Sequence, residues 1–248
     1  MTDIKRLAEM IKECDNIVFF GGAGVSTESG VKDYRSEDGL YSTVKEYGVP
    51  PEQILSRSFF RKSPEVFYDF FRKYFIKEVE PNAAHKALAK LEEKGKLRAI
   101  ITQNIDNLHQ RAGSRNVIEL HGNVRQFYCD SCGEFEETQE VIKEITDGDV
   151  PICKKCGGVI RPRVVMYQER LHPDVPDKAI GYIAEAEMLI IGGTSLAVDP
   201  AASFTRYFQG KYLVILNKSE TVRDGGADLV IRDNIGEVFE KVMAEIEG

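Results

Sequence analysis

Two Cys-x-x-Cys pairs place the strongest constraint on how this 248-residue chain can fold. Cys129 and Cys132 form the first pair, and Cys153 and Cys156 follow after twenty intervening residues. This is the spacing of a zinc ribbon, in which four thiolates fill the tetrahedral shell of one structural ion. A glycine follows each pair and suits the tight turn that aims both sulfurs at the ion. Four unrelated free cysteines are the alternative, and they leave the paired spacing unexplained.

His121 lies eight residues before the first pair, in the stretch VIELHGNVRQFYCDSC. Four thiolates leave no vacancy for a histidine ligand, so His121 is either a packed core residue or a catalytic base. We assign the other three histidines, His85, His109 and His172, a structural role. The fifth cysteine, Cys14, ends the first predicted helix and is expected to be a small buried residue.

The rest of the chain alternates apolar strands with amphipathic helices. We expect strands at 16–20, 97–101, 188–191, 212–216 and 228–231, and helices at 3–13, at 83–94 and from Ile235 onward. Buried apolar strands separated by helices are typical of a mainly parallel sheet with helices on both faces. The fold class is therefore α/β, with a mainly parallel sheet and a smaller domain.

Two segments interrupt this alternation and define the smaller domain. Residues 39–82 are rich in aromatic side chains at helical spacing, which predicts a helical insertion with its own small core rather than an aromatic ligand site. Residues 126–162 contain the four paired cysteines and form the zinc-binding module. The larger domain is then assigned residues 1–38, 83–125 and 163–248.

Charge and hydropathy limit the partners. The net charge is −7 and no Lys/Arg-rich block is present, so direct nucleic acid binding is not expected. No apolar run approaches the length of a membrane span, and the start MTDIKRLAEMIKECD is amphipathic rather than signal-like. We expect a cytoplasmic monomer with no membrane partner and no disulfide framework.

The stretch GGAGVSTESG follows a predicted strand directly and is expected to open a helix, where backbone N–H groups can bind a pyrophosphate. Gly22 and Gly24 match the first two glycines of the dinucleotide-binding pattern, but Thr27 stands at the third position. A plain tight turn would also use these glycines. In the next loop Arg35 can grip a phosphate and Tyr34 can cover a ring, unless this loop is simply solvated.

Polar residues also follow the other predicted strands at the points where they end. The sets are Gln103, Asn104 and Asp106 in TQNID, Thr194 and Ser195 in GGTSL, and Asn217 in VILN. Open parallel sheets bind ligands at the carboxyl ends of their strands, so these sets predict a composite cofactor pocket. His121 lies between these segments and the cysteine module, where we expect a cleft between two domains.

Taken in order, GAGVSTESG, DYR, TQNID, ELHG, the two cysteine pairs, GTSL and ILN resemble the sirtuins, the NAD-dependent protein deacylases, in their bacterial and archaeal form with a single catalytic core. The resemblance runs from about residue 14 to residue 243. It implies a Rossmann-like domain, a small domain with one structural zinc ion, and a cleft between them. NAD and an acyl-lysine side chain of a protein or peptide are expected to enter this cleft from opposite sides.

The resemblance also implies which residues form the site. His121 matches the catalytic histidine, and Asn104 is expected to share the catalytic pocket. The residues expected to bind NAD are Gly22, Ala23, Gly24, Thr27, Asp33, Tyr34, Arg35, Gln103, Asn104, Ile105, Asp106, His121, Gly193, Thr194, Ser195, Asn217 and Ile235. The residues expected to bind substrate, by pairing with its backbone as an added strand, are Val165, Met166, Tyr167 and Gln168.

In the implied reaction the acyl oxygen attacks the anomeric carbon of the nicotinamide ribose, which releases nicotinamide and leaves an alkylimidate. His121 then acts as general base on a ribose hydroxyl, which attacks the imidate carbon. Hydrolysis yields free lysine and O-acyl-ADP-ribose. An imidazole with a pKa of about 6.5 is mostly neutral at pH 7 and can therefore accept this proton.

Four positions depart from the usual sirtuin pattern. Lys32 replaces a proline, which is expected to loosen the cofactor loop, and Tyr34 replaces a phenylalanine. Gln168 replaces a glycine and adds bulk where the peptide is expected to lie, and Asp199 replaces a tyrosine.

Two other functions stay open. A protein mono-ADP-ribosyltransferase would use the same pocket and the same anomeric carbon but would leave ADP-ribose on the protein. A catalytically weak NAD-binding regulatory protein would explain Lys32 and Gln168, but the intact Asn104, Asp106 and His121 count against it. An ordinary dehydrogenase is disfavoured because the third glycine of its pattern is missing.

Overall fold

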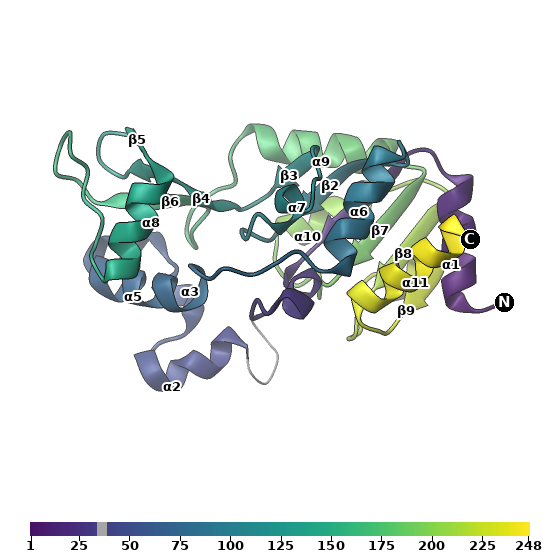
Figure 1. The fold of residues 1–248 in the computed structure, drawn as a ribbon, viewed down its shortest axis with the longest axis horizontal. Coiled ribbons are helices and arrows are strands. Elements are labelled where there is room, and N and C mark those ends of the chain that lie inside the picture. The colour runs from purple at the N-terminus through teal and green to yellow at the C-terminus, as the bar shows by residue number, and fades with distance from the viewer. Residues whose placement is uncertain (34–38) are drawn as a thin grey trace.

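The computed structural model describes residues 1–33 and 39–248 and shows a larger and a smaller lobe (Figure 1). The larger lobe is built on one six-stranded sheet of order β3-β2-β1-β7-β8-β9, in which every pairing is parallel. Its strands are β1 (Ile17–Gly21), β2 (Leu97–Thr102), β3 (Val117–Glu119), β7 (Met188–Gly192), β8 (Tyr212–Leu216) and β9 (Leu229–Ile231). The predicted α/β fold with a Rossmann-like parallel sheet is confirmed.

Helices cover both faces of this sheet. One face packs against α1 (Asp3–Glu13), α6 (Ala83–Glu93) and α11 (Ile235–Glu247), and the other against α9 (Asp174–Glu185) and α10 (Ala201–Phe204). Neighbouring strand residues point to opposite faces, so Phe19 joins the first apolar cluster and Phe20 the second. Thr2 caps α1 through a hydrogen bond from Lys5 N to its Oγ1 (3.3 Å), and Gly95 follows α6 with a φ of 74°.

The smaller lobe combines a three-stranded antiparallel sheet with short helices (Figure 1). Its elements are β4 (Gly122–Cys129), β5 (Phe135–Glu136), β6 (Ile160–Val164), α2 (Val44–Tyr47), α3 (Pro51–Ile54), α4 (Arg57–Lys62), α5 (Pro64–Tyr74) and α8 (Thr138–Asp147). The predicted small core of the helical insertion is present around Leu40, Ile54 and Phe70, with Tyr74 and Phe75 partly buried against it. A second cluster is shared, because Phe60, Phe67 and Phe71 pack with side chains of the cysteine module. The exact domain boundaries stay a prediction.

Strand order places a switch point at the centre of the sheet. The chain extends from β1 to β2 and β3 on one side, and from β7 to β8 and β9 on the other. The last residues of the central strands pair in register, Gly21 with Thr102 and Gly192, and Gly192 with Leu216. The loops that leave these strands must therefore gather at one edge, where open parallel sheets bind ligands. No helix in the described part of the chain is long and apolar enough to cross a membrane.

Candidate active site

Two glycine-containing loops meet at the switch point with their backbones in contact. The N–H of Gly22 donates to the Gly192 carbonyl (3.1 Å), and that of Gly24 donates to the Gly193 carbonyl (2.8 Å). A Cβ on Gly24 would lie 2.8 Å from Gly193 Cα, and one on Gly193, where φ is 59°, would lie 2.3 Å from Val25 N. Only glycine fits at these positions, because the two backbones leave no room for a side chain.

The helix predicted to open in the glycine stretch is short and of the 3₁₀ type. Two short 3₁₀ turns, Ala23–Val25 and Thr27–Ser29, occupy this stretch. Gly30 then turns the chain with a φ of 86°, and Val31 N returns to the Ser26 carbonyl (3.2 Å), so the turn cannot continue. A ligand at this loop would therefore not meet an α-helix terminus, and the N–H groups of Gly22, Gly24 and Val25 already donate to backbone carbonyls.

The polar residues predicted at the strand ends lie at this edge. Gln103 Nε2 donates to Thr194 Oγ1 (3.2 Å), which joins the ends of β2 and β7 across the glycine loop. Asn217 follows β8 directly, and its Nδ2 donates to the Ser219 carbonyl (2.8 Å). Ile235 begins α11 and is buried against the same edge, with its Cδ1 2.5 Å from where a Cβ on Gly192 would stand. Four strand ends thus contribute to one region.

Ser26 connects the residues predicted to line the reactive pocket, although sequence reasoning did not single it out. It is fully buried, and its Oγ donates to Asp106 Oδ2 (2.7 Å) and accepts from Asn104 Nδ2 (3.0 Å). Asn104 Nδ2 also donates to the Gly22 carbonyl (3.0 Å), and His85 Nε2 lies 3.5 Å from Ser26 Oγ. The only signal in the sequence was its position in the glycine stretch. Burial lowers the pKa of His85 to about 4, which fits its assigned structural role.

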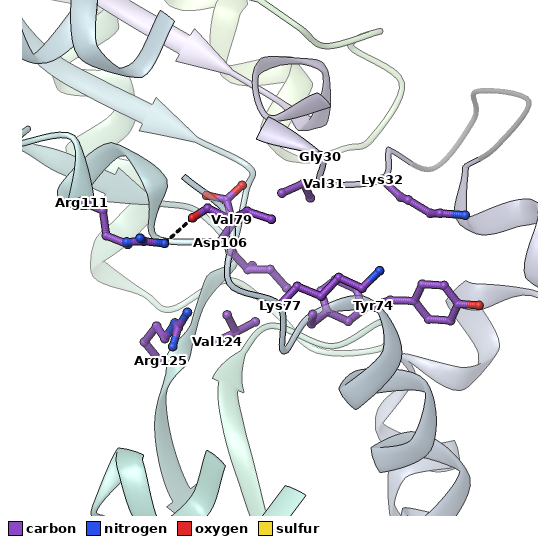
Figure 2. A pocket seen from close by; sticks show the side chains of 12 residues that line it. Gly30, Val31, Lys32, Tyr74, Lys77, Val79, Asp106, Arg111, Val124 and Arg125 are labelled. Carbon is purple, nitrogen blue, oxygen red and sulfur yellow. Dashed lines mark hydrogen bonds between the residues drawn. The ribbon is translucent and has the colours of Figure 1, made fainter. Parts of the chain in front are cut away.

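Asp106 faces a pocket between the two lobes (Figure 2). Burial raises the pKa of this carboxyl, while hydrogen bonds from Ser26 and from the Leu108 backbone oppose that rise. The pocket is lined by Gly30, Val31, Lys32, Tyr74, Phe75, Lys77, Val79, Ile105, Asp106, Arg111, Val124 and Arg125. The predicted neighbours Ile105 and Asp106 therefore share a cavity whose rim carries several cationic side chains.

His121 lies between β3 and β4, where the chain passes from the large sheet to the small one. Its Nδ1 is 2.9 Å from the Gln103 carbonyl oxygen. A carbonyl can only accept, so Nδ1 carries the proton and Nε2 is the basic nitrogen of the neutral ring. Burial lowers the pKa of His121 below its ordinary 6.5, although the hydrogen bond to Gln103 opposes this. His121 therefore has the protonation state of a general base near neutral pH.

The four paired cysteines converge in the smaller lobe. Their sulfur atoms all lie within 4.8 Å of one another, with Cys129 and Cys156 at 3.4 Å and Cys132 and Cys153 at 3.8 Å. A tetrahedral ion with Zn–S bonds of about 2.3 Å needs sulfurs about 3.8 Å apart, so the donor set fits zinc. The glycines after both pairs have a φ of 72°, as the predicted tight turns require. His121 is not part of this cluster.

Comparisons with known proteins agree with this geometry. Residues 22–200 match the model of the Sir2 family. A curated NAD-dependent protein deacetylase of Clostridium acetobutylicum is 52% identical over 97% of this chain and 98% of its own length. This chain belongs to the Sir2 family. Two solved structures also resemble it. Sir2 with a p53 peptide and NAD+ has a TM-score of 0.87 and 41% identity, and the match covers 99% of this chain and 98% of that one. Sir2 with a deacetylated p53 peptide and 3'-O-acetyl ADP-ribose has a TM-score of 0.89 and 40% identity, and the match covers 98% of both chains.

The segment that the Sir2 pattern assigns to the substrate, residues 164–169 (the substrate segment), is held on both sides. Val165 N donates to the His121 carbonyl (2.8 Å). Tyr167 N donates to the Leu55 carbonyl (3.0 Å), and the Tyr167 carbonyl accepts from Arg57 N (3.1 Å). Because Tyr167 already pairs with the helical insertion, a peptide strand would have to use other backbone groups of the segment.

Gln168, which replaces a glycine of the usual Sir2 pattern, has a φ of 75°. A left-handed backbone explains why glycine suits this position. Its side chain is directed to the helical insertion, where Oε1 accepts from Ser58 N (3.1 Å) in the first turn of α4. This contact directs the Gln168 side chain to the helical insertion, so less of its bulk can obstruct a peptide. Of the predicted NAD contacts, Tyr34 and Arg35 lie outside the described residues.

Proposed function

We propose that this chain is an NAD-dependent protein-lysine deacetylase, which transfers the acyl group to ADP-ribose and releases nicotinamide. The observation that carries the proposal is the position of His121, which is a neutral base hydrogen-bonded to the strand end of the predicted cofactor pocket and to the substrate segment. Membership in a family whose curated relatives are named NAD-dependent protein deacetylases supports the same conclusion.

The edge of the large sheet fits a dinucleotide co-substrate. Hydroxyl and amide side chains gather at a switch point, and the two loops that meet there approach each other closely through Gly24 and Gly193. We assign NAD contacts to Gly22, Ala23, Gly24, Thr27, Asp33, Tyr34, Arg35, Gln103, Ile105, Gly193, Thr194, Ser195, Asn217 and Ile235. NAD would supply the electrophilic anomeric carbon that accepts the acyl oxygen.

Three further residues would orient the reactive end of NAD. Ser26 holds Asn104 and Asp106 in one hydrogen-bonded group, which fixes the amide and the carboxyl at the wall of the pocket. Burial raises the pKa of Asp106, and the hydrogen bonds from Ser26 and from the Leu108 backbone oppose that rise by favouring the carboxylate, which can accept from a carboxamide.

His121 would act as the general base through Nε2. The Gln103 carbonyl orients the ring and holds the proton on Nδ1, so that Nε2 is available to take a proton from a ribose hydroxyl. The backbone of His121 also accepts from Val165, which places the base next to the substrate segment. Val165, Met166, Tyr167 and Gln168 would contact the acyl-lysine peptide, while Cys129, Cys132, Cys153 and Cys156 would hold a structural zinc ion away from the chemistry.

Product analysis tests this proposal. The purified protein is mixed with NAD and an acetyl-lysine peptide, and both products are identified by mass spectrometry. Loss of the acetyl mass together with O-acetyl-ADP-ribose is the expected result. ADP-ribose attached to a protein would instead identify a mono-ADP-ribosyltransferase, and binding of NAD without nicotinamide release would identify a binding protein. A cytoplasmic location, a monomeric state and the absence of nucleic acid partners stay predictions.

A further inference from the structure

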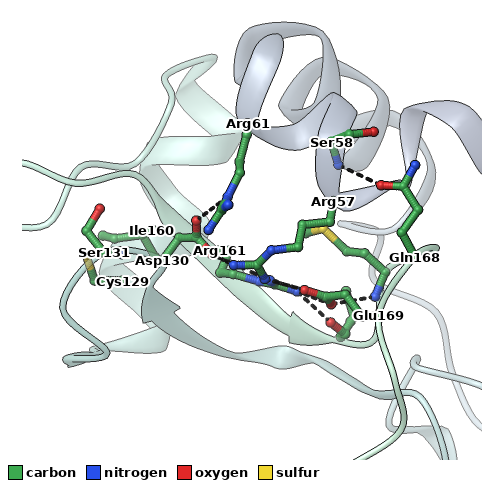
Figure 3. Close-up of polar contacts among 12 residues, drawn as sticks. Arg57, Ser58, Arg61, Cys129, Asp130, Ser131, Ile160, Arg161, Gln168 and Glu169 are labelled. Atoms are coloured by element: carbon green, nitrogen blue, oxygen red, sulfur yellow. Dashed lines mark hydrogen bonds and ion pairs between the residues drawn. The ribbon is translucent and has the colours of Figure 1, made fainter.

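A buried ion pair joins Glu169, the last residue of the substrate segment, to Arg161 in β6. Arg161 is among the largest fully buried side chains, and its guanidinium donates to both carboxylate oxygens of Glu169 at 2.6 and 2.7 Å (Figure 3). The rings of Phe60 and Tyr128 flank it, with centroids 5.9 and 5.4 Å from the guanidinium carbon. A buried bidentate Arg–carboxylate pair requires two parallel hydrogen bonds in one plane, so Arg161 fixes the position of the Glu169 carboxylate.

The same two side chains bind the backbone of the substrate segment. Arg161 Nη2 donates to the Val164 carbonyl (2.9 Å), and Glu169 Oε2 accepts from Met166 N (2.9 Å). Glu169 N also donates to the Met166 carbonyl (3.0 Å), which closes a four-residue turn around Gln168. The positive φ of Gln168 is what the third residue of a type II turn requires. The pair therefore sets the shape of the segment at both ends of this turn.

Asp130 extends the ion pair to the first cysteine turn. It lies between Cys129 and Cys132, with Oδ1 3.6 Å from Arg161 Nη1 and 3.2 Å from Arg57 Nη2. Arg57, at the start of α4, also forms an ion pair with Glu169. The cysteine turn, the helical insertion and the substrate segment therefore meet at one cluster of charges, which Figure 3 shows.

We propose that Arg161 and Glu169 are positioning residues for the acyl-lysine peptide, which hold the substrate segment against His121 and tie it to the cysteine turn through Asp130. The inference rests on the proposed function. The hydrogen bond from Val165 N to the His121 carbonyl joins one end of the segment to the base, so a shift of the segment changes where the acyl group lies. The contacts of the cluster lie in the smaller lobe and the segment, and the effect should therefore fall on the peptide rather than on NAD.

Glu169→Gln tests the inference. It keeps the size of the side chain but replaces one acceptor oxygen by an amide NH₂, which cannot accept from Arg161 or Met166. We expect KM for an acetyl-lysine peptide to rise ~10-fold or more, with KM for NAD within roughly two-fold of wild type and one zinc ion per chain retained. A peptide KM within roughly two-fold of wild type would overturn the inference. Equal increases in both KM values with a lower Tm would also overturn it, because that pattern indicates a merely structural role.

Arg57→Gln keeps the inference testable if Glu169→Gln does not fold. Arg57 is one-third exposed and touches both Glu169 and Asp130, so its loss should raise the peptide KM by roughly 3-fold without unfolding the chain. An unchanged peptide KM in this variant would contradict the role of the cluster. Lys154→Gln is the matched control, since it removes an exposed ion pair with Glu140 (2.7 Å) in the same lobe and should leave both KM values unchanged.

Direct binding separates this inference from the proposed function. Fluorescence anisotropy with a labelled acetyl-lysine peptide gives a Kd without turnover. If wild type binds the peptide but forms no deacetylated product, the proposed deacetylase is wrong, and the ratio of Kd values between wild type and Glu169→Gln still decides the positioning role. If wild type neither binds nor deacetylates the peptide, both proposals are wrong.

Discussion

The two sides of the candidate cleft are stabilised in different ways. At the edge of the large sheet, backbones of the loops at Gly24 and Gly193 touch, and apolar clusters pack against both faces of the sheet. The substrate segment instead depends on charges and thiolates, through the Arg161–Glu169 pair and the cysteine turn next to it. Close packing holds one position over a wide range of conditions, whereas ion pairs and metal sites respond to acid, salt and chelators.

This difference predicts that perturbations of one side leave the other side largely unaffected. Changes in the smaller lobe should alter the peptide parameters, and changes at the glycine loops should alter the NAD parameters. A variant that shifts both by the same factor would show that the two sides are not separable.

The largest effect should come from removing one thiolate. Cys153→Ala deletes a buried member of the four-sulfur cluster, and the remaining three cannot fill a tetrahedral zinc shell. We expect loss of the bound zinc, measured by elemental analysis, and loss of peptide binding. Cys14→Ala is the matched control, because Cys14 is equally buried but lies outside the cluster, and burial raises the pKa of its thiol. Full zinc content in Cys153→Ala would contradict the metal site.

A methyl group on the glycine loop should have the next largest effect. In Gly24→Ala the new Cβ would meet Gly193 Cα at 2.8 Å, so one loop must move, at a cost of about 1–3 kcal/mol. We expect Kd for NAD to rise ~10-fold while the Kd for the peptide is unchanged, both measured by calorimetry. Gly181→Ala adds a methyl group to α9 where nothing lies within 4 Å, and should leave NAD binding intact and stabilise the helix by about 0.5–1 kcal/mol. Unchanged NAD binding in Gly24→Ala would refute the close packing of these loops.

The pH dependence of kcat/KM should reveal the state of His121. The active ring is neutral, and burial lowers its pKa below the ordinary 6.5, so activity should persist below pH 6.5 and fall only as the ring becomes protonated. The acid limb should therefore have its midpoint below 6.5 in a profile measured with saturating NAD. A midpoint above 6.5 would contradict the environment described for His121.

Acid should also act on the substrate segment, at lower pH. The Arg161 guanidinium and the Met166 N–H help to hold the pKa of Glu169 at about 2, below its ordinary 4.5. A lowered folded-state pKa means that this stabilisation is present above about pH 4.5 and is lost as the pH falls toward 2. Unfolding by denaturant between pH 5 and pH 3 should thus show a weaker decline in stability for Glu169→Gln than for wild type. Equal declines would show that Glu169 is not ion-paired.

The smallest effect is expected for Gln168→Gly. Glycine would relieve a left-handed backbone that costs about 1–2 kcal/mol, but it would remove the contact to Ser58 and make the unfolded chain more flexible. These contributions oppose each other, so thermal unfolding should show a change within about 1 kcal/mol. A large loss of stability would mean that the side-chain contact matters more than the backbone strain.

Much of this arrangement could be predicted from the sequence because its signals are local. Apolar runs indicated the strands, Gly95 the end of α6, and the cysteine spacing the four-sulfur cluster. The polar residues after each strand were placed together by topology alone, since parallel strands bring their carboxyl ends to one edge.

What the sequence did not reveal depends on contacts between distant residues. The role of Ser26 depends on its hydrogen bond to Asp106, which is eighty residues away in the sequence. Arg161 has no distinguishing feature in the sequence, and its burial follows from contacts with Phe60 and Tyr128. The helix expected in the glycine stretch stays short because the chain reverses at Gly30. The glycine pattern gives no indication of this reversal. The residue-level assignments of NAD and peptide contacts stay predictions.

The most direct test of the account compares wild type with His121→Ala in two assays on the same sample: release of nicotinamide from NAD in the presence of an acetyl-lysine peptide, and removal of the acetyl group. His121 is assigned to the step after nicotinamide departs, so the variant should lose deacetylation by ~10²-fold or more while nicotinamide release is less affected. Deacetylation at the wild-type rate in His121→Ala would contradict the assignment of His121 as the base, and with it the central claim.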